Sequence, residues 1–125
     1  MWDEEIYNTQ KSIYKMNENI TKTEIFNDGK TIHLYFNGMI GLYVAYGISA
    51  YLLCKYAKAK PSYSDDMQMP VAVINAEHYE TLEEQLGLEK TFKNYRCLQV
   101  ETAYDENEYE EWAGALRMGG AVSRS

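Results

Sequence analysis

The longest stretch without a formally charged side chain runs from Thr31 to Cys54, and it limits what the chain can form. A span of this length can cross a lipid bilayer, so a transmembrane helix is the first structure to weigh. His33, Asn37 and two glycines interrupt the apolar run, and apolar and polar side chains alternate from Ile32 to Phe36. Such alternation is typical of a half-buried strand. We therefore expect this stretch to build the core of a water-soluble fold, with no membrane span.

Turn-forming residues beside this stretch predict a β-hairpin. Residues 27–29, Asn-Asp-Gly, tolerate the positive φ of a hairpin turn, and strand-like segments flank them at 23–26 and 30–36. Before the hairpin, apolar side chains near helical spacing predict a helix over residues 3–17. After it, a stripe of small and apolar side chains predicts a helix over residues 42–58.

The second half of the chain alternates between loop, strand and helix signals. Loop composition over residues 60–68 precedes Val71–Ile74, an apolar run of the kind that forms a strand buried on both faces. Asn75 is placed to cap a helix over residues 76–86, and Gly87 is placed to close it.

The remaining elements complete an α+β fold. A strand is expected over Tyr95–Thr102, and Asp105 with Glu108 forms the capping box of a final helix. Because a helix bridges two of the strands, the order predicts at least one parallel pair. We expect one domain over residues 1–118 with a mixed sheet of about four strands, a β-hairpin and three to four packed helices. Residues 119–125 should form a flexible tail.

Charge is unevenly distributed along the chain. The formal net charge is −7; residues 1–63 carry seven lysines and six acids, so the remaining residues, 64–125, carry a net −8. Nucleic-acid binding needs a basic surface, so this balance disfavours autonomous binding and favours a basic protein partner. The alternative is an acidic surface that only confers solubility. The residues expected to form the partner surface are Glu83, Glu84, Glu108, Glu110 and Glu111.

The chain lacks a recognisable catalytic or metal-binding motif. It has two histidines and two cysteines, and no HExxH, GxSxG or Walker-type sequence. We therefore predict no enzyme activity, no cofactor and no metal. Cys54 and Cys97 are expected to be buried thiols, and the N-terminus lacks the pattern of a signal peptide, which favours the cytoplasm. A third interpretation is a small enzyme or ligand-binding domain whose site assembles from dispersed polar residues such as His33, His78, Tyr43 and Asp65.

Residues 42–50, Leu-Tyr-Val-Ala-Tyr-Gly-Ile-Ser-Ala, carry a family resemblance. They resemble the strand-to-helix turn of the mismatch-recognition domain that opens the MutS DNA-repair proteins. Residues 69–72, Met-Pro-Val-Ala, with Tyr79 and Leu82 after them, are similar to the Met/Pro-rich strand of that domain and its following helix. Residues 95–99 lie where its next strand would be, so the resemblance spans roughly residues 32–101.

The resemblance implies a DNA-associated accessory domain in which mismatch reading is lost. The Phe and Glu with which the family reads a mismatch are replaced by Leu42 and Val44, and Val cannot hydrogen-bond to a base. Free-standing relatives occur on mobile elements, which implies a phage- or element-encoded accessory or inhibitory protein. DNA contact would need either a local basic patch, for which Lys55, Lys58 and Lys60 are candidates, or a fused or associated DNA-binding partner. The expected contact turn comprises Gly38, Gly41, Leu42, Tyr43, Val44 and Tyr46.

Overall fold

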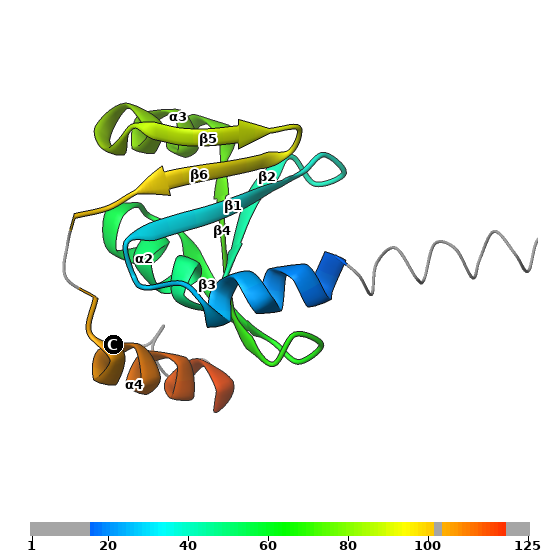
Figure 1. Cartoon of the computed structure of the whole chain (residues 1–125). Helices are drawn as coiled ribbons and strands as arrows, with labels where there is room; N and C mark the ends of the chain where they lie inside the picture. The colour runs from blue at the N-terminus through cyan, green and yellow to red at the C-terminus, as the bar shows by residue number, and fades with distance from the viewer. Residues whose placement is uncertain (1–15, 102–103, 120–125) are drawn as a thin grey trace, which may run out of the picture.

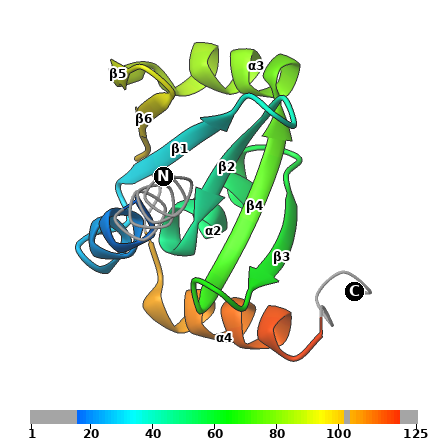
Figure 2. The same cartoon turned by 90° about the vertical axis from the view of Figure 1, so that its right-hand side faces the viewer.

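A computed structural model of the chain describes residues 16–101 and 104–119. Within them, six strands form one sheet in the order β3-β4-β2-β1-β6-β5, with helices on both faces (Figures 1 and 2). The strands are β1 (Thr31–Asn37), β2 (Leu42–Tyr46), β3 (Lys60–Ser64), β4 (Met69–Asn75), β5 (Leu88–Phe92) and β6 (Tyr95–Gln99). The helices are α2 (Gly47–Tyr56), α3 (Ala76–Leu86) and α4 (Glu106–Arg117), and residues 16–25 form a further helix, here called the N-terminal helix. The predicted α+β class is confirmed.

The main core lies between the sheet and α2. Strand alternation turns Ile32 and Leu34 of β1 toward this helix, and both are fully buried. Leu52 and Leu53 of α2 are also fully buried and belong to the same apolar cluster. Burying four such side chains contributes roughly 2 kcal/mol each. The uncharged stretch that opens the sequence therefore forms the centre of the fold.

The opposite face of the sheet is partly covered by the N-terminal helix (Figures 1 and 2). Ile20 of that helix is buried, whereas Tyr35, Tyr46 and Tyr95 of the sheet are half-buried. The ring of Tyr35 lies 6.1 Å from that of Tyr46 and 5.6 Å from that of Tyr95. A tyrosine-rich layer thus separates this helix from the sheet.

Several local signals are confirmed. Asn75 caps α3, since its Oδ1 accepts a bond of 2.7 Å from the backbone N–H of His78. Gly87 ends the helix with a φ of +84°, a conformation that glycine adopts without strain. The strand at residues 71–74 is present as β4, although Val71 and Val73 are only half-buried. These signals depend on neighbouring residues and so can be read from the sequence.

The hairpin predicted over residues 23–36 is wrong. Residues 16–25 are helical, and the hairpin of this region joins β1 to β2 instead. Ile20 and Glu24, four residues apart, share the buried side of the N-terminal helix, while Ile25 and Phe26 stay exposed. Packing of that buried side overrides the strand propensity of residues 23–26. The helix expected over residues 3–17 and the tail over 119–125 lie largely outside the described residues.

The helix predicted over residues 42–58 begins too early. Leu42–Tyr46 is strand β2, which pairs with β1 on one side and β4 on the other. The ladder on both sides favours the extended form, and α2 begins only at Gly47. Tyr43, Val44 and Tyr46 therefore belong to a strand and not to the predicted helix.

The sheet is antiparallel in every pairing of the described residues, so the predicted parallel pair is wrong. Two strands were not predicted from the sequence: β3, which lies in the segment of loop composition, and β5, whose side chains are all exposed. Proline is tolerated on an edge strand, and β3 is one. β5 lies between α3 and β6 and reverses the direction of the chain. As a result, β6 runs antiparallel to β4.

Candidate functional site

The acidic residues expected to form one surface occupy two ends of the molecule. Glu83 and Glu84 belong to α3, whereas Glu108, Glu110 and Glu111 belong to α4. In both views α3 lies at one end of the sheet and α4 at the other (Figures 1 and 2). The structure therefore separates the predicted surface into two acidic helices.

Neighbouring glutamates of α3 have different surroundings. Glu84 is exposed, and at about 100° per residue it shares a stripe with Glu77 and Glu80. Glu83 is half-buried and accepts a hydrogen bond of 2.7 Å from the hydroxyl of Tyr79. Burial and this bond raise the pKa of the Tyr79 hydroxyl. Glu83 thus helps to hold Tyr79 in place. The exposed acidic stripe of α3 consists of Glu77, Glu80 and Glu84, and Glu83 does not belong to it.

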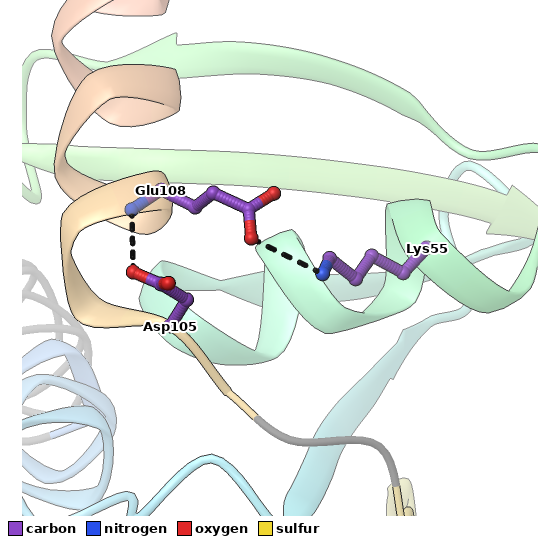
Figure 3. A network of polar contacts seen from close by, with 3 residues as sticks. All are labelled: Lys55, Asp105 and Glu108. Carbon is purple, nitrogen blue, oxygen red and sulfur yellow. Dashed lines mark hydrogen bonds and ion pairs between the residues drawn. The ribbon is translucent and has the colours of Figure 1, made fainter.

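The first turns of α4 concentrate five carboxylates, those of Asp105, Glu106, Glu108, Glu110 and Glu111. Asp105 caps the helix, because its Oδ1 accepts a bond of 3.0 Å from the backbone N–H of Glu108 (Figure 3). The side chain of Glu108 lies 3.9 Å from the Lys55 ammonium of α2. The Asp105 half of the predicted capping box is confirmed, whereas the Glu108 carboxylate lies toward Lys55 of α2.

Aromatic rings lie beneath the acidic turns of α4. Tyr51 of α2 is buried, and the rings of Tyr104, Tyr109 and Trp112 meet it edge-on at 6.2, 5.7 and 5.4 Å. The latter three side chains are half-buried. Such edge-to-face contacts are favourable and fix the rings in position. α4 therefore combines carboxylates with partly accessible aromatic surface.

The predicted contact turn is only partly accessible. Gly38 and Gly41 are exposed in the β1–β2 turn, but the most exposed side chains there are Met39, at 96%, and Ile40, at 57%. Four further residues of the prediction lie in β2 and are half-buried or buried, namely Leu42, Tyr43, Val44 and Tyr46. The ring of Tyr43 stacks on that of Tyr79 at 4.1 Å. The apolar tip of this turn was not singled out from the sequence.

The dispersed polar residues of the predicted ligand site do not converge. His33 faces the side of the sheet that carries Tyr95, and its Nδ1 lies 2.6 Å from the Tyr95 hydroxyl. Burial lowers the pKa of this imidazole. His78 lies on α3 and faces α2, and Asp65 belongs to the turn between β3 and β4. The two histidines therefore lie on different sides of the sheet.

A hollow of about 570 Å³ separates α2 from α3. Its ionisable side chains other than tyrosine are Lys55, Lys58, His78 and Cys54. Burial raises the pKa of the Cys54 thiol to about 11, so this group is neutral at physiological pH. Lys60, the third lysine of the predicted basic patch, lies on β3 and does not line the hollow.

Glu24, which was not predicted as a functional residue, is buried in the fold. Glu24 of the N-terminal helix is 4% exposed, and its carboxylate accepts bonds from the backbone N–H and the hydroxyl of Ser49, at 2.9 and 2.6 Å. Asn27 donates a third bond of 3.2 Å. Burial raises the pKa of Glu24 to about 7, against the opposing effect of these donors. No local pattern marks Glu24 as buried, because Ser49, which donates two of its bonds, lies 25 residues away.

Among residues 16–101 and 104–119, no three His, Cys, Asp or Glu side chains are grouped so that they could hold a metal ion. No helix in the same residues is long and apolar enough to cross a membrane. The scan against family models and the searches of the curated proteins and the solved structures find no match.

Proposed function

We propose that this protein is a non-enzymatic interaction protein that binds a basic protein partner through the acidic turns of α4. One observation carries the proposal: exposed carboxylates surround partly accessible aromatic rings on this helix. Aromatic side chains supply much of the binding energy in protein interfaces, and complementary charge directs association.

The carboxylates of α4 are largely uncommitted. Within the described part of the chain only Glu108 forms an ion pair there, and at 3.9 Å with 61% of its side chain exposed this pair is weak. Glu106, Glu110 and Glu111 have no basic partner in that part of the chain. A partner that supplies lysine or arginine would therefore not have to break existing ion pairs.

The acidic stripe of α3 is the weaker candidate. Glu77, Glu80 and Glu84 are exposed, but the aromatic residue of this helix, Tyr79, is 4% exposed. Without accessible apolar area, an acidic stripe favours solubility over specific binding. The two helices offer a matched comparison, since each can lose three carboxylates.

Affinity capture from the native host, using the full chain as bait at low and at 0.5 M salt, tests the proposal. We expect one partner that is released by salt and lost on replacing Glu106, Glu110 and Glu111 by Gln. The matched control replaces Glu77, Glu80 and Glu84 by Gln and should keep the partner, since its change in net charge is the same. Equal loss in both variants would show that net charge alone drives capture. Salt-resistant capture would contradict the proposal.

The cellular setting is part of the same proposal. Cys54 and Cys97 are free thiols, which fits a reducing compartment such as the cytoplasm. We place the protein among accessory proteins of a phage or mobile element, on the strength of the resemblance to the MutS mismatch-recognition domain.

A DNA-associated accessory domain of MutS-like fold is the second candidate. The exposed Met39 and Ile40 at the β1–β2 turn favour it, because apolar side chains of this kind can wedge between base steps. Gel-shift titrations with matched and mismatched duplexes at low salt test it, with Met39→Ser and Ile40→Ser together as the variant. A shift that the double variant loses would support this candidate. The absence of any shift at micromolar protein would remove it.

A further inference from the structure

The hollow between α2 and α3 has the opposite charge from the rest of the protein. The chain carries a net −7, and both acidic helices are rich in exposed carboxylates. The hollow is lined by two lysines and a histidine but by no acid. A local concentration of cations in an acidic protein attracts anions into a confined site.

Two of these basic side chains have no partner within the described residues. Lys55 is engaged, since its ammonium lies 5.0 Å from the centre of the Tyr51 ring and 3.9 Å from Glu108. Lys58 forms no ion pair, and the imidazole of His78 has no hydrogen-bond partner, among residues 16–101 and 104–119. Lys58 follows the end of α2 and His78 lies on α3, 20 positions apart in the sequence, and both line the same hollow.

Further side chains give the hollow a polar side and an apolar side. His78, Thr81 and Gln85 share one stripe of α3; the imidazole and the Gln85 amide can donate to a ligand, while the Thr81 hydroxyl donates to the Glu77 carbonyl at 3.4 Å. Tyr56 and Ala57, both half-buried, supply apolar surface beside them. His78 also lies in the first turn of α3, where the helix dipole favours negative charge.

We propose that this hollow binds a small molecule that carries a phosphate or carboxylate group on an apolar or aromatic body. Lys58 and His78 hold the anionic group, Gln85 binds a remaining oxygen, and the body lies on Tyr56 and Ala57. A volume of about 570 Å³ suits a ligand of this size. The proposal is independent of partner binding by α4.

The surrounding acids favour a small ligand over a polyanion. Glu77, Glu80 and Glu84 occupy the exposed stripe of α3 next to the one that lines the hollow. Glu108 stands beyond Lys55 on the other side. A nucleic-acid strand reaching into the hollow would have to pass one of these carboxylate groups, whereas a single anionic group enters without meeting them.

Titration of the ¹⁵N-labelled full chain with phenyl phosphate, followed by amide chemical shifts, tests the site. We expect saturable shifts confined to residues 54–58 and 76–85, with a dissociation constant of about 1 mM for a ligand of this size. Benzoate in a second arm shows whether carboxylate suffices, and inorganic phosphate in a third shows what the aromatic body adds. Shifts centred elsewhere, or none up to 20 mM of each probe, would overturn the proposal.

Single variants identify the side chains that hold the anion. Lys58→Gln and His78→Gln should each weaken phenyl phosphate binding about tenfold, because each removes a charge-assisted hydrogen bond. Lys93→Gln, in the turn between β5 and β6, loses the same charge outside the hollow and should bind as the unmodified protein does. Lys58 and His78 are exposed, so we expect both variants to keep the melting temperature of the unmodified protein. An unchanged melting temperature then shows that a loss of binding is not a loss of folding.

If all three variants bind phenyl phosphate equally weakly, general charge attraction and not the hollow holds the anion, and the proposal is wrong. A short DNA duplex is the remaining arm. If it shifts the same amides at lower concentration than phenyl phosphate does, the hollow is a contact for nucleic acid and the small-molecule proposal is wrong.

Discussion

Glu24 joins two elements that are distant in the sequence. The N-cap position of α2 is Tyr46, whose side chain makes no capping bond. The carboxylate of Glu24, from the N-terminal helix, accepts instead from the backbone of Ile48 and Ser49 at the start of α2. Gly47 leaves room for it, since a Cβ at that position would lie 3.2 Å from the Glu24 side chain. Glu24 therefore caps a helix to which it does not belong.

Stability should fall as pH rises through the range in which Glu24 titrates. The folded carboxyl has a pKa of about 7, against an ordinary value of 4.5, because burial disfavours its charged form. The folded state thus binds a proton that the unfolded state has released, and its stabilising effect is complete below pH 4.5 and lost above pH 7. At about 1.4 kcal/mol per unit, the loss is about 3 kcal/mol. Urea unfolding at pH 5, 6, 7 and 8 measures it.

The control for this prediction separates Glu24 from other titrating groups. Glu24→Gln cannot ionise, so the difference in unfolding free energy between the unmodified protein and this variant should change with pH by the same amount. Glu84→Gln, at an exposed position of α3, should leave the pH profile unchanged. A pH-independent difference for Glu24→Gln would mean that its carboxylate stays charged, held by the donors around it.

Capping shows which single-residue roles the sequence reveals. Asn75 and Asp105 cap helices that begin at the next residue, so a short pattern identifies them. Glu24 caps α2 across 25 positions, and only the packing of the N-terminal helix brings it there. Lys58 and His78 likewise line one hollow only because tertiary packing brings α3 beside the end of α2. Roles that depend on tertiary contacts leave no local pattern.

At the scale of elements, strands with strong local signals were found and weakly marked ones were not. β4 is apolar and β6 begins at the predicted Tyr95, whereas β5 has no buried residue. β5 forms because the chain returns from α3 along β6, with a register shift between Leu88 and Lys90. Hydrogen bonds to the backbone of β6 hold β5, and none of its side chains is buried. A strand of this kind has no hydrophobic periodicity from which it could be predicted.

Hydrogen exchange should show that β5 opens separately from the rest of the sheet. It pairs with β6 alone among the described residues, and all five of its side chains are exposed. β1 has a strand on each side and fully buried Ile32 and Leu34. Elements with little buried apolar area open at low free-energy cost. We expect the amides of β5 that bond to β6 to exchange about 100-fold faster than those of β1.

The opposite edge strand provides the comparison for this measurement. β3 is also an edge, but α4 packs against it, so its amides should exchange more slowly than those of β5. Exchange of β5 as slow as that of β1 would mean that a partner or another copy of the chain covers this edge.

For the whole molecule, the sequence determined the class of fold and the sign of its charge but not their arrangement in space. The net −8 of residues 64–125 was read as one surface, yet α3 and α4 hold their acids at opposite ends of the sheet (Figure 2). β6 runs antiparallel to β4, so the helices that follow these two strands lie at different ends of the sheet. Charge counted along the chain therefore overstates how concentrated it is on the surface.

Salt should stabilise this protein, because repulsion among its acids outweighs attraction. Within the described residues only two ion pairs form, Lys22 with Glu18 at 3.3 Å and Lys55 with Glu108 at 3.9 Å, and their side chains are 31–65% exposed. Raising NaCl from 10 to 150 mM shortens the screening length from about 30 to about 8 Å, which weakens repulsion within each acidic helix. We expect the melting temperature to rise by about 4 °C. Replacing Glu77, Glu80 and Glu84 of α3 by Gln should raise the melting temperature at 10 mM NaCl and reduce its dependence on salt. A melting temperature that falls with salt in the unmodified protein would show that attractive pairs dominate its electrostatics.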